Sequence, residues 1–127
     1  MVVGLGVDIM DVERMAAELR AGDAGFLPSV FTRAEVTAWD GGRQRARRYA
    51  ACFAAKEAAL KALAPDGEAG IGWTDIEVLP GPAAAPALTF HRAAAAVAAR
   101  RGITRCRLSV SCTRRLALAT VVLESPS

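Results

Sequence analysis

The sequence predicts one α+β domain over residues 1–127, in which a mainly antiparallel sheet packs against helices that include one long central helix. The chain begins with strand-like alternation, continues with helical periods, and returns largely to strands in its second half. Its length of 127 residues fits a single core, and a hydrophobic content of 53% excludes a disordered ground state. Aromatic residues make up only 6%, so we expect a core of small side chains and association between subunits to bury more surface.

The first ten residues alternate as in a strand. Every second residue from Val3 to Ile9 is apolar, which predicts that this face is buried, and the opposite face carries Gly4, Gly6 and Asp8. Glycine in a strand leaves room for a ligand or a neighbouring backbone. The alternative is that Asp8 simply ends the strand and caps the next helix.

The remaining elements follow from helical periods, capping signals and turn residues. Thr32 with Glu35 three residues later forms a capping box, and Gly102 is a helix C-cap signal. The segment 21–29 is expected to be a non-helical stretch that separates two helices. We expect helices over 11–20, from Thr32 to Gly41, over 47–63 and over 90–101, and strands over 74–79, 87–90, 105–112 and 116–123.

The basic residues are distributed unevenly. Arginine supplies all but two of the 16 basic side chains, and the two lysines are Lys56 and Lys61. The net charge of +3 and the pI near 9.1 predict anionic partners. Four arginines lie within residues 43–48, so a nucleic-acid-binding protein is a third, weaker alternative; without interleaved aromatics or a known motif, we expect no nucleic-acid partner.

The cysteines and the N-terminus indicate the compartment. Cys52, Cys106 and Cys112 are odd in number and lack the CxxC spacing of metal sites, which favours a reducing cytoplasm. The apolar start lacks a basic leader and contains Asp8, so no signal peptide is indicated. No run approaches the roughly 20 apolar residues that cross a bilayer, so we expect no membrane contact.

Asp8, Glu57 and Lys61 form the candidate centre, with Lys56 beside them. Glu57 and Lys61 lie four residues apart on one face of the long helix, and Lys56 lies on the other flank of its apolar stripe. By itself the Glu57–Lys61 pair can be a surface ion pair worth about 0.3–0.5 kcal/mol. Together with Asp8, however, two carboxylates suit Mg²⁺, and a lysine beside them suits phosphate. The residues alone predict Mg²⁺-dependent phosphoryl transfer or phosphodiester binding, with both lysines beside the metal ligands.

Two motifs resemble those of a known family. Residues 6–9 (GVDI) followed by Glu13-Arg14, and residues 53–63 (FAAKEAALKAL), are similar to the motifs of holo-acyl-carrier-protein synthases, the small 4′-phosphopantetheinyl transferases. The segments 31–35 and 73–78 and the closing strands also follow the order of that family. The resemblance covers nearly the whole chain and implies a single 4′-phosphopantetheinyl transferase-like domain.

The resemblance also implies a reaction. Such enzymes transfer phosphopantetheine from coenzyme A to a serine of an apo acyl carrier protein and release 3′,5′-ADP. By motif match, Asp8 and Glu57 bind Mg²⁺, Lys61 contacts the pyrophosphate, and Arg14 docks the acidic carrier protein. The resemblance further implies a homotrimer with active sites at the subunit interfaces. The coenzyme A site is assigned, by the same match, to Lys61 and to Arg45, Arg47, Arg48, Ser111, Cys112 and Thr113.

The sequence departs from the family pattern at two positions. Cys112 replaces a histidine, and a thiol does not reproduce the paired donor and acceptor of imidazole. Cys52 replaces an arginine, which is expected to remove a phosphate contact. The alternative function is therefore a catalytically weakened homologue that binds coenzyme A or a carrier protein without efficient transfer. The sequence leaves open whether the carrier serves fatty-acid, polyketide or peptide synthesis.

Overall fold

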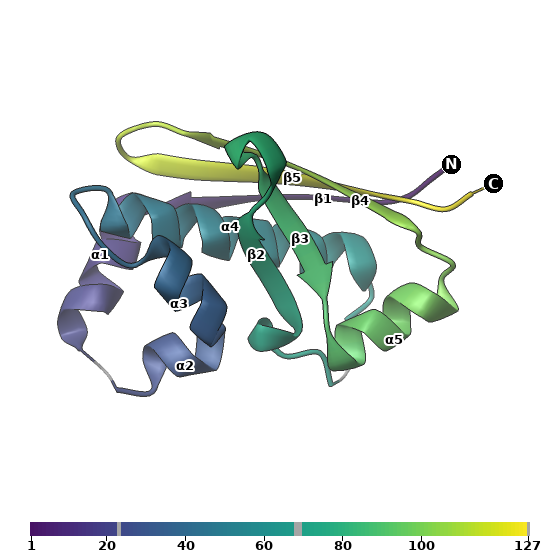
Figure 1. Cartoon of the computed structure of the whole chain (residues 1–127), viewed down its shortest axis with the longest axis horizontal. Helices are drawn as coiled ribbons and strands as arrows, with labels where there is room; N and C mark the ends of the chain where they lie inside the picture. The colour runs from purple at the N-terminus through teal and green to yellow at the C-terminus, as the bar shows by residue number, and fades with distance from the viewer. Residues whose placement is uncertain (23, 68–69, 127) are drawn as a thin grey trace.

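The computed structural model describes residues 1–22, 24–67 and 70–126. Figure 1 shows a three-stranded sheet seen edge-on along one side of the molecule, with α4 lying against it and the β2–β3 hairpin crossing in front of α4. The arrangement confirms the predicted α+β class. The elements in chain order are β1 (Val2–Asp11), α1 (Val12–Ala21), α2 (Phe26–Val30), α3 (Arg33–Trp39), α4 (Arg45–Leu63), the 3₁₀ turn η1 (Trp73–Asp75), β2 (Ile76–Pro80), the 3₁₀ turn η2 (Pro82–Ala84), β3 (Pro86–Phe90), α5 (Arg92–Arg100), β4 (Arg105–Cys112) and β5 (Leu116–Glu124).

Both sheets are antiparallel. In the larger one β5 is central, between β1 and β4, and Asp8 of β1 lies opposite Ala119 of β5. The N-terminal amine of Met1 donates to the Ser125 carbonyl oxygen at 2.8 Å, which holds the two chain ends together. Among the described residues, no helix is both long and apolar enough to span a bilayer.

β1 packs its glycine face, not its apolar face, against α4. A β-carbon placed on Gly6 would lie 1.9 Å from the carbonyl oxygen of Ala58, so the strand and the helix are in backbone contact. The prediction that the apolar face of this strand is buried is therefore wrong within the chain, because bare glycine backbone lets the helix approach more closely than side chains would. The outward side chains Leu5, Val7 and Ile9 are 66%, 50% and 55% exposed.

The core is centred on α4, which the sheet covers on one side and β2 and α3 on the other. Small side chains dominate this helix, as the composition predicts. Alanine lets sheet and helix pack at close range while each residue keeps a high helix propensity. The alanines of α4 that are at most 1% exposed are Ala50, Ala54, Ala55, Ala58, Ala59 and Ala62.

Several element boundaries differ from those predicted. The segment expected to break the chain contains α2, whose short length gives little periodicity. Asp11, not Asp8, caps α1, since its carboxylate accepts from the Arg14 backbone N–H at 3.1 Å. The predicted strand over 74–79 begins two residues later, at Ile76, because η1 occupies its first positions. Phe90, predicted to open a helix, ends β3 instead.

Candidate active site

Asp8 and Lys61 meet where β1 crosses α4. Lys61 Nζ lies 2.8 Å from Asp8 Oδ1 and donates to the Val7 carbonyl oxygen at 3.3 Å. The Asp8 side chain is 18% exposed and that of Lys61 is 54% exposed. The pKa of Lys61 is raised, chiefly by its hydrogen bond to Asp8. A charged ammonium group is therefore held over a largely covered carboxylate at the protein surface.

Glu57 shares a cleft of about 360 Å³ with Asp8. The pKa of Glu57 is raised, first by burial and next by the negative charge of Asp8. This electrostatic interaction means that two carboxylates from different elements are close enough to repel each other, and Lys61 offsets only part of that repulsion. The fold thus brings Asp8, Glu57 and Lys61 into one place from β1 and α4.

Arg14 of α1 lies at the rim of the same cleft, which also has an apolar wall. From the sequence, Phe53 was predicted only to belong to the apolar stripe of the long helix, and Phe26 fell in the segment predicted to separate two helices. Their position beside charged groups depends on long-range packing of α1 and α2, for which the sequence contains no local signal. The apolar residues that line the cleft are Ile9, Met10, Met15, Phe26 and Phe53.

Lys56 lies away from the cleft, in the interior. Its ammonium is 2.7 Å from Glu35 Oε1, and both side chains are 0% exposed. Lys56 Nζ also donates to the carbonyl oxygens of Trp73, at 3.0 Å, and Ile76. The expectation that both lysines lie beside the metal ligands is wrong for Lys56, because this position on α4 faces α3 and β2.

Cys52 belongs to the same buried cluster as Lys56. Its thiol lies 3.3 Å from Glu35 Oε2, and burial raises the pKa of this thiol far above its usual range. Glu35 Oε2 also accepts from the Val78 backbone N–H at 2.7 Å. The side chain at position 52 thus lies among core groups. This position gives no support to the expectation that replacing arginine by Cys52 removes a phosphate contact.

The three arginines at the start of α4 have different surroundings. Arg45 pairs with Asp40 at 2.9 Å, and Arg48 Nε donates to the Trp39 carbonyl oxygen at 3.2 Å. Arg47 Nε is buried and has no hydrogen-bond partner among the described residues. An unsatisfied buried donor is costly, so Arg47 is the member of this group best suited to an anionic ligand.

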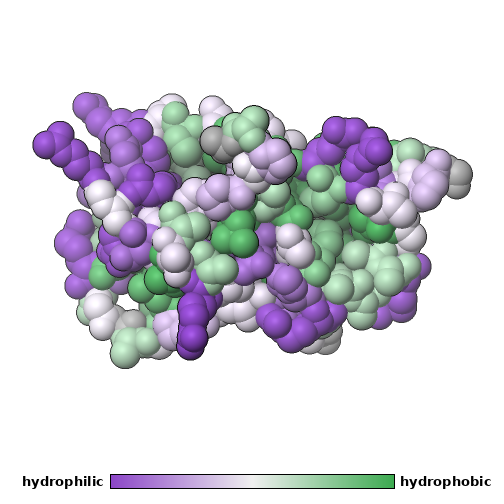
Figure 2. Space-filling view, in the orientation of Figure 1, coloured by the Kyte–Doolittle hydropathy of each residue, from purple (hydrophilic) through white to green (hydrophobic). Residues whose placement is uncertain are grey.

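Ser111, Cys112 and Thr113 lie where β4 turns into β5. Burial raises the pKa of the Cys112 thiol, and the nearby Arg47 charge opposes part of that rise, which places Cys112 beside the start of α4. The Thr113 hydroxyl accepts from the Leu116 backbone N–H at 3.0 Å and closes the hairpin. Ser111 is exposed and lies opposite Leu118 in the register. In Figure 2, hydrophilic side chains project at the end of the molecule that carries this hairpin and the start of α4.

The fold and the cleft define a small α+β protein in which two carboxylates and a lysine meet where β1 crosses α4. The first turn of α4 is rich in arginine. This set of groups suits a ligand that carries phosphates. Comparison with known families agrees with that class. The model of the 4′-phosphopantetheinyl transferase superfamily matches residues 4–121, and the chain belongs to this superfamily.

Individual relatives match along almost the whole chain. The chain is 40% identical over 124 residues to a holo-[acyl-carrier-protein] synthase of Koribacter versatilis, covering 98% of this chain and 99% of that protein. It is 41% identical over 128 residues to one of Anaeromyxobacter dehalogenans, covering 98% and 97%.

Solved structures give the same result. The holo-[acyl-carrier-protein] synthase of Neisseria meningitidis matches with a TM-score of 0.87 and 26% identity, over 98% of this chain and 100% of that one. The Bacillus anthracis holo-(acyl-carrier-protein) synthase, solved in complex with CoA (3′,5′-ADP), matches with a TM-score of 0.79 and 29% identity, over 98% of each chain.

Proposed function

We propose that the chain is a holo-acyl-carrier-protein synthase, which transfers 4′-phosphopantetheine from coenzyme A to a serine hydroxyl of an apo acyl carrier protein and releases 3′,5′-ADP. The observation that carries this proposal is that Asp8 and Glu57 line one cleft and that Lys61 pairs with Asp8 beside it, at 2.8 Å. Relatives at 40% and 41% identity bear this name, and the Bacillus anthracis structure is a complex with CoA (3′,5′-ADP).

Asp8 and Glu57 are the residues that would hold Mg²⁺. The ion takes one or two protein carboxylates and completes its shell with water and phosphate oxygens, and this pair offers that donor set. Among the described residues, no group of three or more His, Cys, Asp or Glu side chains offers a fuller set of ligands. The raised pKa of Glu57 beside Asp8 supports the assignment, because a cation would relieve the repulsion between them. When bound, Mg²⁺ supplies positive charge to the phosphate oxygens.

The transfer is a displacement at phosphorus. The serine oxygen forms a bond to the phosphorus that carries pantetheine, and the bond from that phosphorus to the departing oxygen of 3′,5′-ADP breaks. Lys61, charged and half-exposed beside Asp8, contacts the pyrophosphate and stabilises the negative charge that develops on the leaving group. The serine proton passes to a base, and a pH–rate profile that compares the wild type with Glu57→Gln tests whether Glu57 accepts it.

The arginine-rich end of α4 is proposed to hold the 3′-phosphate of coenzyme A. Arg47, with its unsatisfied buried Nε, is the principal contact, and Arg45 and Arg48 contribute charge while they keep their protein partners. Cys112 lies beside Arg47, which supports a role for residues 111–113 at the same end of the substrate. Arg47→Gln is expected to raise KM for coenzyme A more than it lowers kcat.

Arg14 is proposed to dock the carrier protein. Its position at the rim of the cleft puts a positive charge beside the groups that would receive the serine. An acidic carrier protein is attracted by such a charge, which raises the association rate more than the affinity. Arg14→Gln is therefore expected to lower kcat/KM for the carrier most strongly at low salt.

A homotrimer is proposed because the outer face of the larger sheet is apolar. Monomers rarely expose contiguous apolar surface beyond a few hundred Å². Asp8 lies between two of the outward side chains, so the strand that carries a metal ligand would also lie at the subunit interface. Sedimentation is expected to give the mass of three copies, and a stable monomer or dimer would contradict the proposal. The apolar side chains on this face are Leu5, Val7, Ile9, Leu116 and Leu118.

The decisive experiment measures the mass of apo carrier proteins. Incubation with the protein, Mg²⁺ and coenzyme A is expected to add the mass of one phosphopantetheine to a carrier from a panel that covers fatty-acid, polyketide and peptide synthesis. Asp8→Asn and Lys61→Met are expected to lose this gain, and Asp66→Asn, an exposed carboxylate outside the cleft, is expected to keep it. No mass gain across the panel would refute the proposal.

Cys112 is the residue that separates an efficient enzyme from a weakened homologue. Its raised pKa keeps the thiol neutral, so it offers only a weak hydrogen bond where the family pattern has imidazole. For an efficient enzyme, Cys112→His is expected to change turnover little. A large gain on that substitution would favour the weakened homologue.

We place the reaction in the cytoplasm. Cys52, Cys106 and Cys112 are all free in the structure, as is usual for proteins of a reducing compartment.

A further inference from the structure

Arg101 lies where three elements of the fold come together. It follows α5 directly, and its backbone N–H donates to the Val97 carbonyl oxygen at 3.0 Å. Gly102, with φ 68°, then turns the chain toward β4. Figure 1 shows α5 at the same end of the molecule as the C-terminal end of α4 and the N-terminus. The end of α5 therefore presents the half-buried side chain of Arg101 to both α4 and β1.

The guanidinium group of Arg101 donates to three backbone carbonyl oxygens. Nη1 donates to those of Ala62, at 2.9 Å, and Leu63, at 2.6 Å, in the last turn of α4. Nη2 donates to that of Val3, at 2.6 Å, in β1. The last carbonyl oxygens of a helix have no partner within the helix, and a cation beside them is favoured by the helix dipole. One side chain thus satisfies the end of α4 and binds it to the strand.

The bond to β1 falls at an irregularity of that strand. The register between β1 and β5 shifts between Val2 and Gly4, so Val3 is an extra residue of the strand. A β-carbon placed on Gly4 would lie 2.5 Å from the carbonyl oxygen of Ala62, which is one of the oxygens that Arg101 binds. Arg101 therefore bonds both backbones at a point where they are in close contact.

Glycine backbone fixes how near β1 lies to α4 but offers no side chain to interlock with the helix. Both Gly4 and Gly6 face carbonyl oxygens of α4. Directional hydrogen bonds, by contrast, fix where one backbone lies along the other. Asp8 continues the glycine face of β1, and Lys61 immediately precedes the turn that Arg101 binds. The position of the strand along the helix therefore decides how these two side chains meet.

We propose that Arg101 is a positioning residue for the transfer site: by holding the irregular start of β1 on the last turn of α4, it fixes where Asp8 lies relative to Glu57 and Lys61. Arg101 is absent from the residues that line the cleft, so its effect passes through the two elements that it joins. The catalytic consequence rests on the proposed function, whereas the role in holding strand on helix does not.

Steady-state kinetics of transfer test the catalytic consequence, with rates expressed per folded protein. Arg101→Gln is expected to lower kcat about tenfold, because a misplacement of about 1 Å can cost roughly 100-fold and a smaller shift costs less. KM for coenzyme A is expected to stay within about twofold, since the arginines at the start of α4 are unchanged. Arg101→Lys keeps a cation with several donors and is expected to recover part of the lost kcat. A kcat of Arg101→Gln within about twofold of the wild type, or no recovery in Arg101→Lys, would overturn the proposal.

Amide hydrogen exchange, read by mass spectrometry, tests the role in holding β1 on α4 without any substrate. In Arg101→Gln, peptides that cover residues 2–11 and 57–63 are expected to exchange about tenfold faster, while those of β2 and β3 exchange as in the wild type. A general loss of stability would instead accelerate exchange in all of these segments. Uniform acceleration, or unchanged exchange over residues 2–11, would overturn the proposal.

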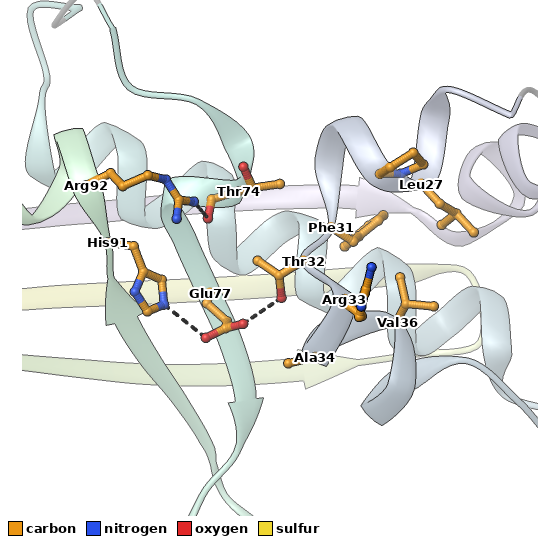
Figure 3. A pocket seen from close by; sticks show the side chains of 11 residues that line it. Leu27, Phe31, Thr32, Arg33, Ala34, Val36, Thr74, Glu77, His91 and Arg92 are labelled. Atoms are coloured by element: carbon orange, nitrogen blue, oxygen red, sulfur yellow. Dashed lines mark hydrogen bonds and ion pairs between the residues drawn. The ribbon is translucent and has the colours of Figure 1, made fainter.

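Arg92→Gln is the matched control, because it also removes an arginine that binds backbone. Arg92 donates to Asp75 Oδ1 at 2.8 Å and to the Thr74 carbonyl oxygen at 2.7 Å, and Figure 3 shows the second of these bonds. Both partners belong to η1, so this variant is expected to keep the wild-type kcat and the wild-type exchange over residues 2–11. A wild type without transfer would refute the proposed function, and the exchange measurement would still decide whether Arg101 holds the strand on the helix.

Discussion

Replacing Gly6 by alanine should separate β1 from α4 and disturb the cleft between them. The new β-carbon would lie 1.9 Å from the Ala58 carbonyl oxygen, whereas ordinary contact begins at 3.4 Å, so the backbones must part by about 1.5 Å. Overpacking of a core commonly costs about 1–3 kcal/mol, and here both clashing groups are backbone, so we expect about 3 kcal/mol or more. Asp8 lies two residues along the same strand, and a misplacement of about 1 Å can cost roughly 100-fold in rate.

Urea unfolding and the carrier mass assay measure the two effects, with the rate expressed per folded protein. Gly72→Ala is the matched control, because its β-carbon would lie 3.8 Å from the nearest side-chain atom and its φ of −98° suits any residue. It is expected to be nearly as stable and as active as the wild type. The reasoning fails if the free energy of unfolding of Gly6→Ala stays within about 0.5 kcal/mol of the wild-type value and its transfer rate within about tenfold. The close packing of β1 on α4 would then not determine the geometry of the site.

Three further results follow from the structure. Lys56→Met leaves Glu35 buried without its cation, and urea unfolding should show that the free energy of unfolding falls by about 3–5 kcal/mol. Lys61→Met breaks a pair at the surface, so the free energy of unfolding should fall by less than about 1 kcal/mol while transfer is abolished. The hydrogen bond that the Thr32 hydroxyl donates lowers the pKa of Glu77 and contributes stability that is present above the usual pKa of 4.5 and is lost as the pH falls through the lowered pKa. Glu77→Gln should therefore be about 1–3 kcal/mol less stable at pH 7, with the deficit shrinking below pH 4.5 in chemical denaturation. Leu118→Glu should dissociate the proposed trimer without unfolding the chain, which sedimentation and circular dichroism together would show.

Local signals predicted the parts of the fold that depend on neighbouring residues. Thr32 and Glu35 form the reciprocal hydrogen bonds of a capping box, at 3.1 Å and 2.8 Å, because both groups belong to one helix turn. The spacing of Glu57 and Lys61 likewise placed both on one side of α4. No periodicity links β1 to α4, so their grouping with Asp8 was predicted from the chemistry of two carboxylates beside a lysine, and the family motifs then supported it.

Long-range packing decided what the pattern could not. The helical wheel put Lys56 and Lys61 on opposite flanks of one apolar stripe without showing which flank is buried, and the ion pair with Glu35 of α3, at 2.7 Å, holds Lys56 in the core. On β1, alternation showed two faces without showing which of them would meet the helix. The glycine face packs on α4 because backbone contact with Ala58 brings the strand closer to the helix than leucine or isoleucine side chains would allow. Such choices depend on three-dimensional partners that lie 21 and 52 residues away in the sequence.

The burial of Lys56 has a practical consequence for chemical labelling. The sequence contains two lysines, and the Lys56 side chain is 0% exposed while that of Lys61, beside Asp8, is 54% exposed. Amine-directed reagents therefore meet a single accessible side chain, Lys61, besides the terminal amine of Met1. A fluorophore or an affinity tag attached through the Lys61 amine would block the proposed transfer site, so coupling through a thiol is the safer route for an active reagent. Conversely, the loss of lysine labelling when coenzyme A is added would measure occupancy of that site directly.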